Sequence, residues 1–141
     1  MKRVFKFSIL LAVLTIAIAG CKKNDPEGGG GKSGKLSPPS WIRGTWEGYG
    51  LEFQFTSNDV IMNGESFKQI FNLNEPGVGK TTIKETKNTS SLYEFATTIT
   101  ETGGGSEKMT WSFKKGDGSY IEFGIEETGT KITDYITLDK Q

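Results

Sequence analysis

Apolar and polar residues alternate over several stretches of this chain. Leu51, Phe53 and Phe55, for example, are separated by Glu52 and Gln54. Successive side chains of a β-strand point to opposite faces, so a period of two predicts strands that bury one face. Together with the turn residues between the runs, the alternation predicts eight strands, at residues 44–49, 51–56, 58–62, 80–86, 91–100, 107–115, 119–127 and 130–139.

One segment follows a different period. Phe67, Ile70 and Phe71 are spaced at i, i+3 and i+4. Ser66 and Gln69 fit a capping box, in which a serine and a glutamine satisfy backbone N–H groups at the start of a helix. The spacing predicts a short helix over residues 67–73. The same residues also fit a strand with one apolar face, so periodicity alone leaves both interpretations open.

The short breaks between the runs favour antiparallel pairing. Eight antiparallel strands must hide their apolar face, and closure into a barrel does so while it also removes the exposed edges. A β-sandwich hides the same face. The pattern therefore predicts an all-β fold with one short helix, and it does not decide between a barrel and a sandwich.

The first part of the chain has the pattern of a targeting segment. A basic start, residues 1–6, precedes an almost wholly apolar run, residues 7–19. This run has the length of a signal-peptide core and is shorter than the roughly 20 residues that a membrane-spanning helix needs. Ile18-Ala19-Gly20-Cys21 follows and resembles the lipobox of bacterial lipoproteins. The resemblance implies that residues 1–20 are a lipoprotein signal peptide and that lipid on Cys21 anchors the chain to a membrane.

Residues 21–40 are rich in Gly, Pro and Lys, a composition typical of a flexible tether. Asp25 and Glu27 resemble the acidic export tag of surface-exposed lipoproteins of Gram-negative gut bacteria. That resemblance implies an outer-membrane lipoprotein of the cell envelope, displayed on the cell surface. The folded domain is expected over residues 41–141.

The start of that domain carries a second resemblance. Gly44 and Trp46 match the Gly-x-Trp motif of lipocalins, and the run from Pro39 resembles the start of the lipocalin-like (calycin-like) lipoproteins of Gram-negative bacteria. The resemblance implies an eight-stranded up-and-down barrel with Trp46 at its closed end. Lipocalins often place an arginine from the end of the chain across this tryptophan. No arginine is present there, and Lys140 is expected to take its place through a cation–π contact.

Composition excludes several kinds of chemistry. The chain has no histidine, and acylation consumes its one cysteine, so we expect no histidine-based triad, no thiol nucleophile and no His/Cys metal site. Residues 1–20 hold three of the 17 basic residues and no acid, which leaves a formal charge of −3 on the remainder. No basic patch for nucleic acid remains. We therefore expect no enzyme, no metal and no cofactor.

The predicted inward faces carry a candidate binding site. The walls of a barrel cavity are predicted at Tyr93, Phe95, Trp111, Phe113 and Phe123, and Trp46, at the closed end, is a further candidate ligand-binding residue. Glu85 shares a face with Ile83, and Asp134 shares one with Ile136, so these two carboxylates are candidate polar contacts. The barrel would then be a binding module for a small apolar ligand, or for an envelope protein or glycan. In the alternative, the aromatic side chains fill the interior and the lipoprotein is a structural or interaction protein without a ligand.

Overall fold

The computed structural model describes residues 34–71, 79–132 and 134–141, which all belong to one compact unit, Lys32–Gln141. The fold of these residues is all-β, as predicted, with one short helix, α2 (Phe67–Ile70). The described residues form nine strands where eight were predicted: β1 (Gly44–Gly48), β2 (Leu51–Phe55), β3 (Val60–Met62), β4 (Glu65–Ser66), β5 (Lys80–Asn88), β6 (Leu92–Thr100), β7 (Ser106–Lys115), β8 (Tyr120–Glu127) and β9 (Ile136–Lys140).

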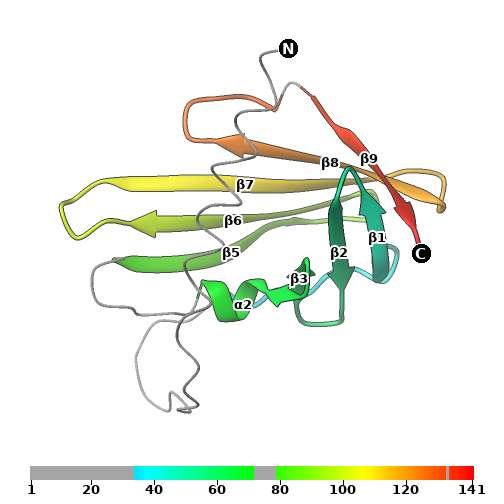
Figure 1. Cartoon of the computed structure of the whole chain (residues 1–141), viewed down its shortest axis with the longest axis horizontal. Coiled ribbons are helices and arrows are strands. Elements are labelled where there is room, and N and C mark those ends of the chain that lie inside the picture. Colours follow the sequence, from blue (N-terminus) through cyan, green and yellow to red (C-terminus); the bar gives the residue numbers. More distant parts are fainter. Residues whose placement is uncertain (1–33, 72–78, 133) are drawn as a thin grey trace. The chain divides into compact units, whose positions relative to one another are not determined.

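All nine strands belong to one antiparallel sheet in the order β4-β3-β2-β1-β9-β8-β7-β6-β5. Because the first strand pairs with the last, this is the order of an up-and-down barrel that is open between β4 and β5. The sheet curls strongly into a half-barrel, with the long strands β5 to β8 running across the direction of β1 and β2 (Figure 1). The prediction of an eight-stranded closed barrel is therefore wrong in strand number and, within the described residues, in closure.

The additional strand and the helix explain where the sheet opens. β4 is only two residues long, and the chain passes from it directly into α2. Ser66 caps this helix, since its hydroxyl accepts a hydrogen bond from the Gln69 backbone N–H at 3.3 Å. The predicted cap is thus confirmed, and the helix covers the first part of the predicted range; residues 72–73 lie outside the described residues.

The last strand begins later than predicted. Residues 130–139 were expected to form it, but β9 starts only at Ile136. The preceding loop packs against the outer face of the sheet instead: a Cβ atom at the buried Gly124 would lie 2.6 Å from Ile132 and 3.1 Å from the Tyr135 ring. A glycine in β8 therefore makes room for a loop that the period-two pattern had assigned to a strand.

The predicted inward faces of the long strands are confirmed. Apolar residues at alternate positions are buried and face each other across strand pairs, as in Phe95↔Trp111 and Phe113↔Phe123. The core of the domain is therefore the concave side of the curled sheet. The fully or almost fully buried large side chains are Leu36, Ile42, Trp46, Phe53, Phe67, Tyr93, Phe95, Trp111, Phe113, Ile121, Phe123 and Leu138.

A segment before β1, which we call the strap (residues 34–41), packs against β5. Leu36 is fully buried and Pro38 is buried as well. The backbone of Gly34 approaches β5 so closely that a Cβ atom there would lie 1.6 Å from the Ile83 carbonyl oxygen. The predicted tether, residues 21–40, therefore ends in residues that belong to the folded unit.

Candidate functional site

The six aromatic residues predicted for the binding site are all buried in the core. Tyr93, Phe95 and Phe113 are fully buried, and the exposure of Trp46, Trp111 and Phe123 does not exceed 2%. Ring centroids of neighbours on β6, β7 and β8 are 5.0–6.1 Å apart, for example 5.0 Å between Phe113 and Phe123. The alternation along the sequence therefore identified this surface correctly.

The opposite side of the half-barrel reaches across and touches this surface. The Phe53 ring on β2 lies 5.2 Å from Phe113 and 4.8 Å from Phe123, and Phe55 lies 4.9 Å from Phe113. Phe67 of α2 lies 4.9 Å from Trp111 and 5.1 Å from Phe95. Most of these pairs are edge-to-face or tilted, the geometry in which aromatic rings attract each other. Side chains from β2 and α2 thus fill the interior of the half-barrel and contact the aromatic rings of β6, β7 and β8.

Trp46, the tryptophan of the Gly-x-Trp motif, is buried in this core. Its indole N–H donates to the Ile42 carbonyl at 2.6 Å, which ties β1 to the turn before it. Gly44 has a φ of 124°, a value that favours glycine, so the first position of the Gly-x-Trp motif has a backbone reason. Lys140 pairs with Trp46 across β1 and β9, and its Nζ lies 5.6 Å from the ring centroid. The cation–π contact predicted for Lys140 is confirmed.

A buried polar pair on the inward face is satisfied internally. Thr97 is 2% exposed and accepts a hydrogen bond from the Trp111 indole N–H at 3.0 Å. Buried polar groups need such partners because they have lost water. This pair consequently stabilises the core.

Glu85 lies on the predicted face, but at the edge of the sheet. Its half-buried carboxylate accepts hydrogen bonds from the Ser37 backbone N–H at 2.8 Å and from the Asn88 side-chain amide at 3.1 Å. Asn88 also donates to the Ser37 carbonyl at 2.8 Å. The carboxylate therefore contacts the strap, which comes from the predicted tether.

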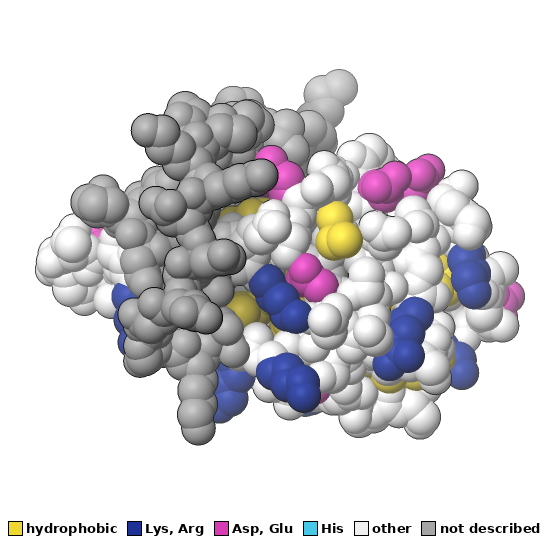
Figure 2. Space-filling view, turned by 90° about the horizontal axis from the view of Figure 1, so that it is seen from below, with side chains coloured by type: hydrophobic (Ala, Val, Ile, Leu, Met, Phe, Trp, Pro, Cys, Tyr) yellow, Lys and Arg dark blue, Asp and Glu magenta, His cyan; other side chains and the backbone are white. Residues whose placement is uncertain are grey.

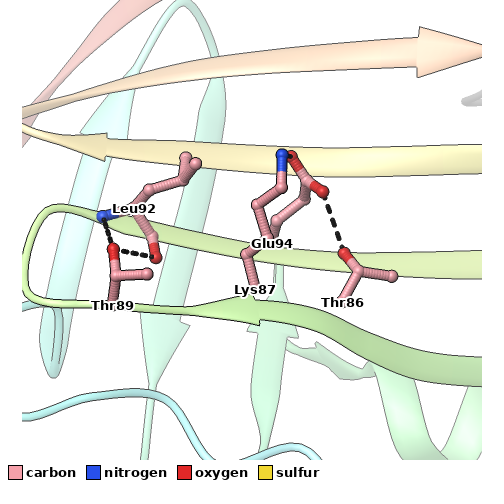
Figure 3. A network of polar contacts seen from close by, with 5 residues as sticks. All are labelled: Thr86, Lys87, Thr89, Leu92 and Glu94. Atoms are coloured by element: carbon pink, nitrogen blue, oxygen red, sulfur yellow. Dashed lines mark hydrogen bonds and ion pairs between the residues drawn. The ribbon is translucent and has the colours of Figure 1, made fainter.

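A β-bulge in β5 brings the side chains of Glu85 and Asn88 to the same side of the strand. The register of β5 against β6 shifts between Glu85 and Lys87, so Thr86 is an extra residue. Thr86 and Lys87 both turn to Glu94 on β6, with a hydrogen bond of 3.0 Å and an ion pair of 3.5 Å (Figure 3). Asn88 then pairs with the inward Tyr93 and faces the strap together with Glu85. The alternation rule fails at a bulge, and no signal in the sequence marks this one.

Tyr93 lies beneath the strap. Its hydroxyl is buried without a hydrogen bond of acceptable geometry among the described residues. Burial, and after it the nearby Glu85 carboxylate, raise the pKa of Tyr93 well above its ordinary value. The phenol therefore stays protonated at any physiological pH, and it is a poor general base.

Asp134 is not a part of this core. Its side chain is exposed and precedes β9, so the prediction that it faces inward with Ile136 is wrong. The loop that contains it follows the outer face, where Lys114 lies 3.6 Å above the Tyr135 ring. Of the two carboxylates that were predicted to share a pocket, Glu85 is half-buried against the strap and Asp134 is exposed.

The surface has a shallow open depression near two hairpin turns. It has a volume of about 430 Å³ and is lined by Glu47, Glu52, Asn63 and Gln141, among others. Tyr49, the only large apolar side chain of the described residues that is strongly exposed, belongs to the adjacent turn. On the face shown in Figure 2, basic side chains are spread among polar and acidic ones and do not form one patch.

Residues with other kinds of chemistry do not come together in the described part of the chain. No three acidic, histidine or cysteine side chains there are placed to hold a metal ion. No helix among the described residues is both long and apolar enough to cross a membrane. Cys21, the predicted lipidation site, lies outside the described residues. Comparisons with protein-family models, curated proteins and solved structures give no match for this chain.

Proposed function

We propose that this chain is a cell-envelope lipoprotein, anchored through lipid on Cys21, whose half-barrel domain binds another envelope protein through its surface. The observation that carries the second part of this proposal is the contact between opposing walls of the core. Phe53 and Phe67 touch Phe113, Phe123 and Trp111, so the space that an apolar ligand would need is occupied by side chains. The function is then one of the outer surface.

The lipocalin resemblance supports the architecture within this proposal. The positive φ of Gly44 and the Trp46–Lys140 contact give two motif residues a structural purpose at the end of the core. In this proposal the chain keeps the end closure of a lipocalin-like protein and fills the interior instead of opening it. The acidic residues behind Cys21 favour display on the outer membrane surface.

The filled core is tested with a fluorescent apolar probe. We expect that 1-anilinonaphthalene-8-sulfonate added to the full-length chain in detergent micelles produces no saturable, one-to-one fluorescence increase beyond that of micelles alone. The reason is that a preformed pocket needs several hundred Å³ of enclosed volume, and in this core the aromatic side chains occupy that space. Stoichiometric binding that the Phe113→Ala substitution alters would contradict the proposal in favour of a ligand-binding barrel.

The anchor is tested in cells. Metabolic labelling with a palmitate analogue should mark the wild-type chain, and Cys21→Ser should lose the label and accumulate as an uncleaved precursor. Asn24→Ser, a polar change in the same tether, serves as the matched control and should be labelled like wild type. Labelling of the Cys21→Ser chain would refute acylation at this position.

A further inference from the structure

β5 is an edge strand that the strap and the end of α2 contact without strand pairing. It ends the sheet, and its residues pair with β6 alone among the described strands. The strap covers part of this edge, but within the described residues no backbone–backbone hydrogen bond joins the two. An edge strand presents unpaired N–H and C=O groups that another strand can pair with. The strap hides these groups without using them.

The strap is held by a few contacts, most of them made by side chains. Besides the Ser37–Glu85 and Asn88–Ser37 bonds, the Trp41 indole donates to the Thr89 carbonyl at 2.8 Å. Arg43 also donates from Nε to the Pro38 carbonyl at 3.0 Å, Leu36 and Pro38 are buried, and the Gly34 backbone lies against Ile83. Pro38 and Pro39 have no backbone N–H, so this part of the strap is unable to pair with β5 as a strand. A segment without prolines would make hydrogen bonds that the strap lacks.

Charge indicates which segment would replace it. Lys80, Lys84 and Lys87 of β5 are exposed, Lys87 has its partner in Glu94, and Glu85 is the one acidic residue of the strand. The strap adds Lys35 and contains no acidic residue. Opposite charges on adjacent strands attract and like charges repel. The lysines therefore disfavour pairing with a second copy of β5 and favour a strand rich in Asp and Glu.

We propose that β5 is a docking edge for an extended acidic segment of a partner protein, and that the strap is the segment which this partner displaces. The proposal rests on the surface-binding function proposed above and names the partner's chemistry. Main-chain hydrogen bonds would provide affinity, and the lysines of β5 would provide the preference for acidic sequences. The strap, which leads toward the tether, would keep the edge covered until the partner arrives.

The test uses a fluorescein-labelled peptide of alternating glutamate and valine, as long as β5, and fluorescence anisotropy with the full-length chain in neutral detergent micelles. The double variant Asn88→Ala with Trp41→Phe removes strap bonds without touching the core. It should bind the peptide at least about tenfold more tightly than wild type, because less binding energy is spent on displacement. An equal affinity of both proteins would overturn the role of the strap.

Charge reversal tests the edge itself. In the loosened variant, Lys84→Glu should weaken binding of the acidic peptide by about tenfold, whereas the matched change Lys131→Glu, in the loop before β9, should change it less than about twofold. Near-UV circular dichroism establishes that each variant is folded. A lysine-for-glutamate version of the peptide that binds equally well would contradict the acidic preference.

Hydrogen exchange locates the bound peptide. When the peptide binds, amide protection should increase in residues 80–88. Any increase elsewhere in the chain should be much smaller. Three results would each overturn the docking edge. The first is protection confined to another strand, and the second is no binding even by the loosened variant. The third is that this variant forms dimers in place of peptide complexes. The surface-binding function would survive these results if the apolar probe still finds no pocket, so the two failures are distinguishable.

Discussion

Tyr49 occupies an unfavourable backbone conformation. Its φ is 56°, and with Gly50 at 78° it forms the two-residue turn between β1 and β2. Asn63 and Gly64 form an equivalent turn, but there the Asn63 side chain accepts a hydrogen bond from the Glu52 backbone N–H at 2.8 Å. Asparagine adopts the left-handed region at a lower cost in energy than tyrosine does. The Tyr49 side chain gains little from burial, because it is 81% exposed.

Tyr49→Asn should therefore stabilise the domain by about 0.5–1 kcal/mol, since it relieves a left-handed tyrosine in the type of turn that prefers asparagine. The measurement is the midpoint of urea unfolding of the full-length chain. Tyr49→Phe keeps the strain and should leave the midpoint unchanged. A lower stability of the asparagine variant would mean that the phenol makes a contribution that the strain argument omits.

The raised pKa of Tyr93 predicts a loss of stability at high pH. Below about pH 10 the phenol is protonated in both the folded and the unfolded chain, so it has no effect on the pH dependence. Above that pH the unfolded chain releases the proton while the folded chain keeps it, and the free energy of unfolding should fall by up to about 1.4 kcal/mol per pH unit.

Urea unfolding between pH 9 and pH 11 measures this slope. Tyr93→Phe should reduce it, because phenylalanine has no proton to lose. At neutral pH the same substitution should change stability by less than about 1 kcal/mol, since the buried hydroxyl makes no hydrogen bond of acceptable geometry among the described residues. An unchanged slope in the variant would show that Tyr93 ionises equally in both states.

The Thr97–Trp111 bond gives a further single-residue test. Thr97→Val keeps the shape of the side chain but leaves the Trp111 indole N–H without its buried acceptor. The expected cost is about 1–3 kcal/mol in the free energy of unfolding. Thr97→Ser retains the hydroxyl and serves as the control in chemical unfolding. A loss in Thr97→Val no larger than that in Thr97→Ser, which keeps the hydroxyl, would show that the hydrogen bond contributes little.

At the level of elements, α2 and the strap occupy the opening that β4 and β5 leave in the sheet. Phe67 inserts from α2 against Trp111, and Leu36 is fully buried from the strap. The Thr81 hydroxyl also donates to the Phe71 carbonyl at 2.8 Å, which ties β5 to the end of α2. Neither element is a strand, yet each shields apolar surface that a closed barrel would shield by pairing.

Leu36→Ala should consequently destabilise the domain by about 2–5 kcal/mol, the range found for large-to-small changes at buried sites. Lys35→Ala, its exposed neighbour, should stay within about 0.5 kcal/mol of wild type. Guanidinium unfolding of the full-length chain compares the two. If both variants unfolded like wild type, the strap would not be a part of the cooperative unit.

For the molecule as a whole, the filled interior means that a ligand cavity has to be made by mutation. Phe53→Ala removes a ring that touches both Phe113 and Phe123. It should cost about 3–5 kcal/mol, and the cavity should bind benzene, as apolar engineered cavities do. Benzene should then raise the melting temperature of this variant but not that of wild type or of Phe53→Leu. A rise in wild type would indicate an existing void.

Much of the architecture was predictable from local pattern. The inward positions of β2, β6, β7 and β8 follow from alternation, and the helix cap at Ser66 follows from a capping box. The aromatic surface of the candidate site was predicted residue by residue for the same reason. The failures at Asp134, at the bulge after Glu85 and at the strap are places where a distant segment changes what a local pattern means.

Local alternation was therefore sufficient for the strand content and for which side of most strands is buried, because the side-chain direction in a strand depends only on parity. Whether the sheet closes, what lies between its walls and where the tether ends depended on contacts between residues far apart in the chain. Phe53 with Phe123 and Ser37 with Glu85 are such contacts. Their formation depends on how the sheet curls, and a curl is a property of all its strands together.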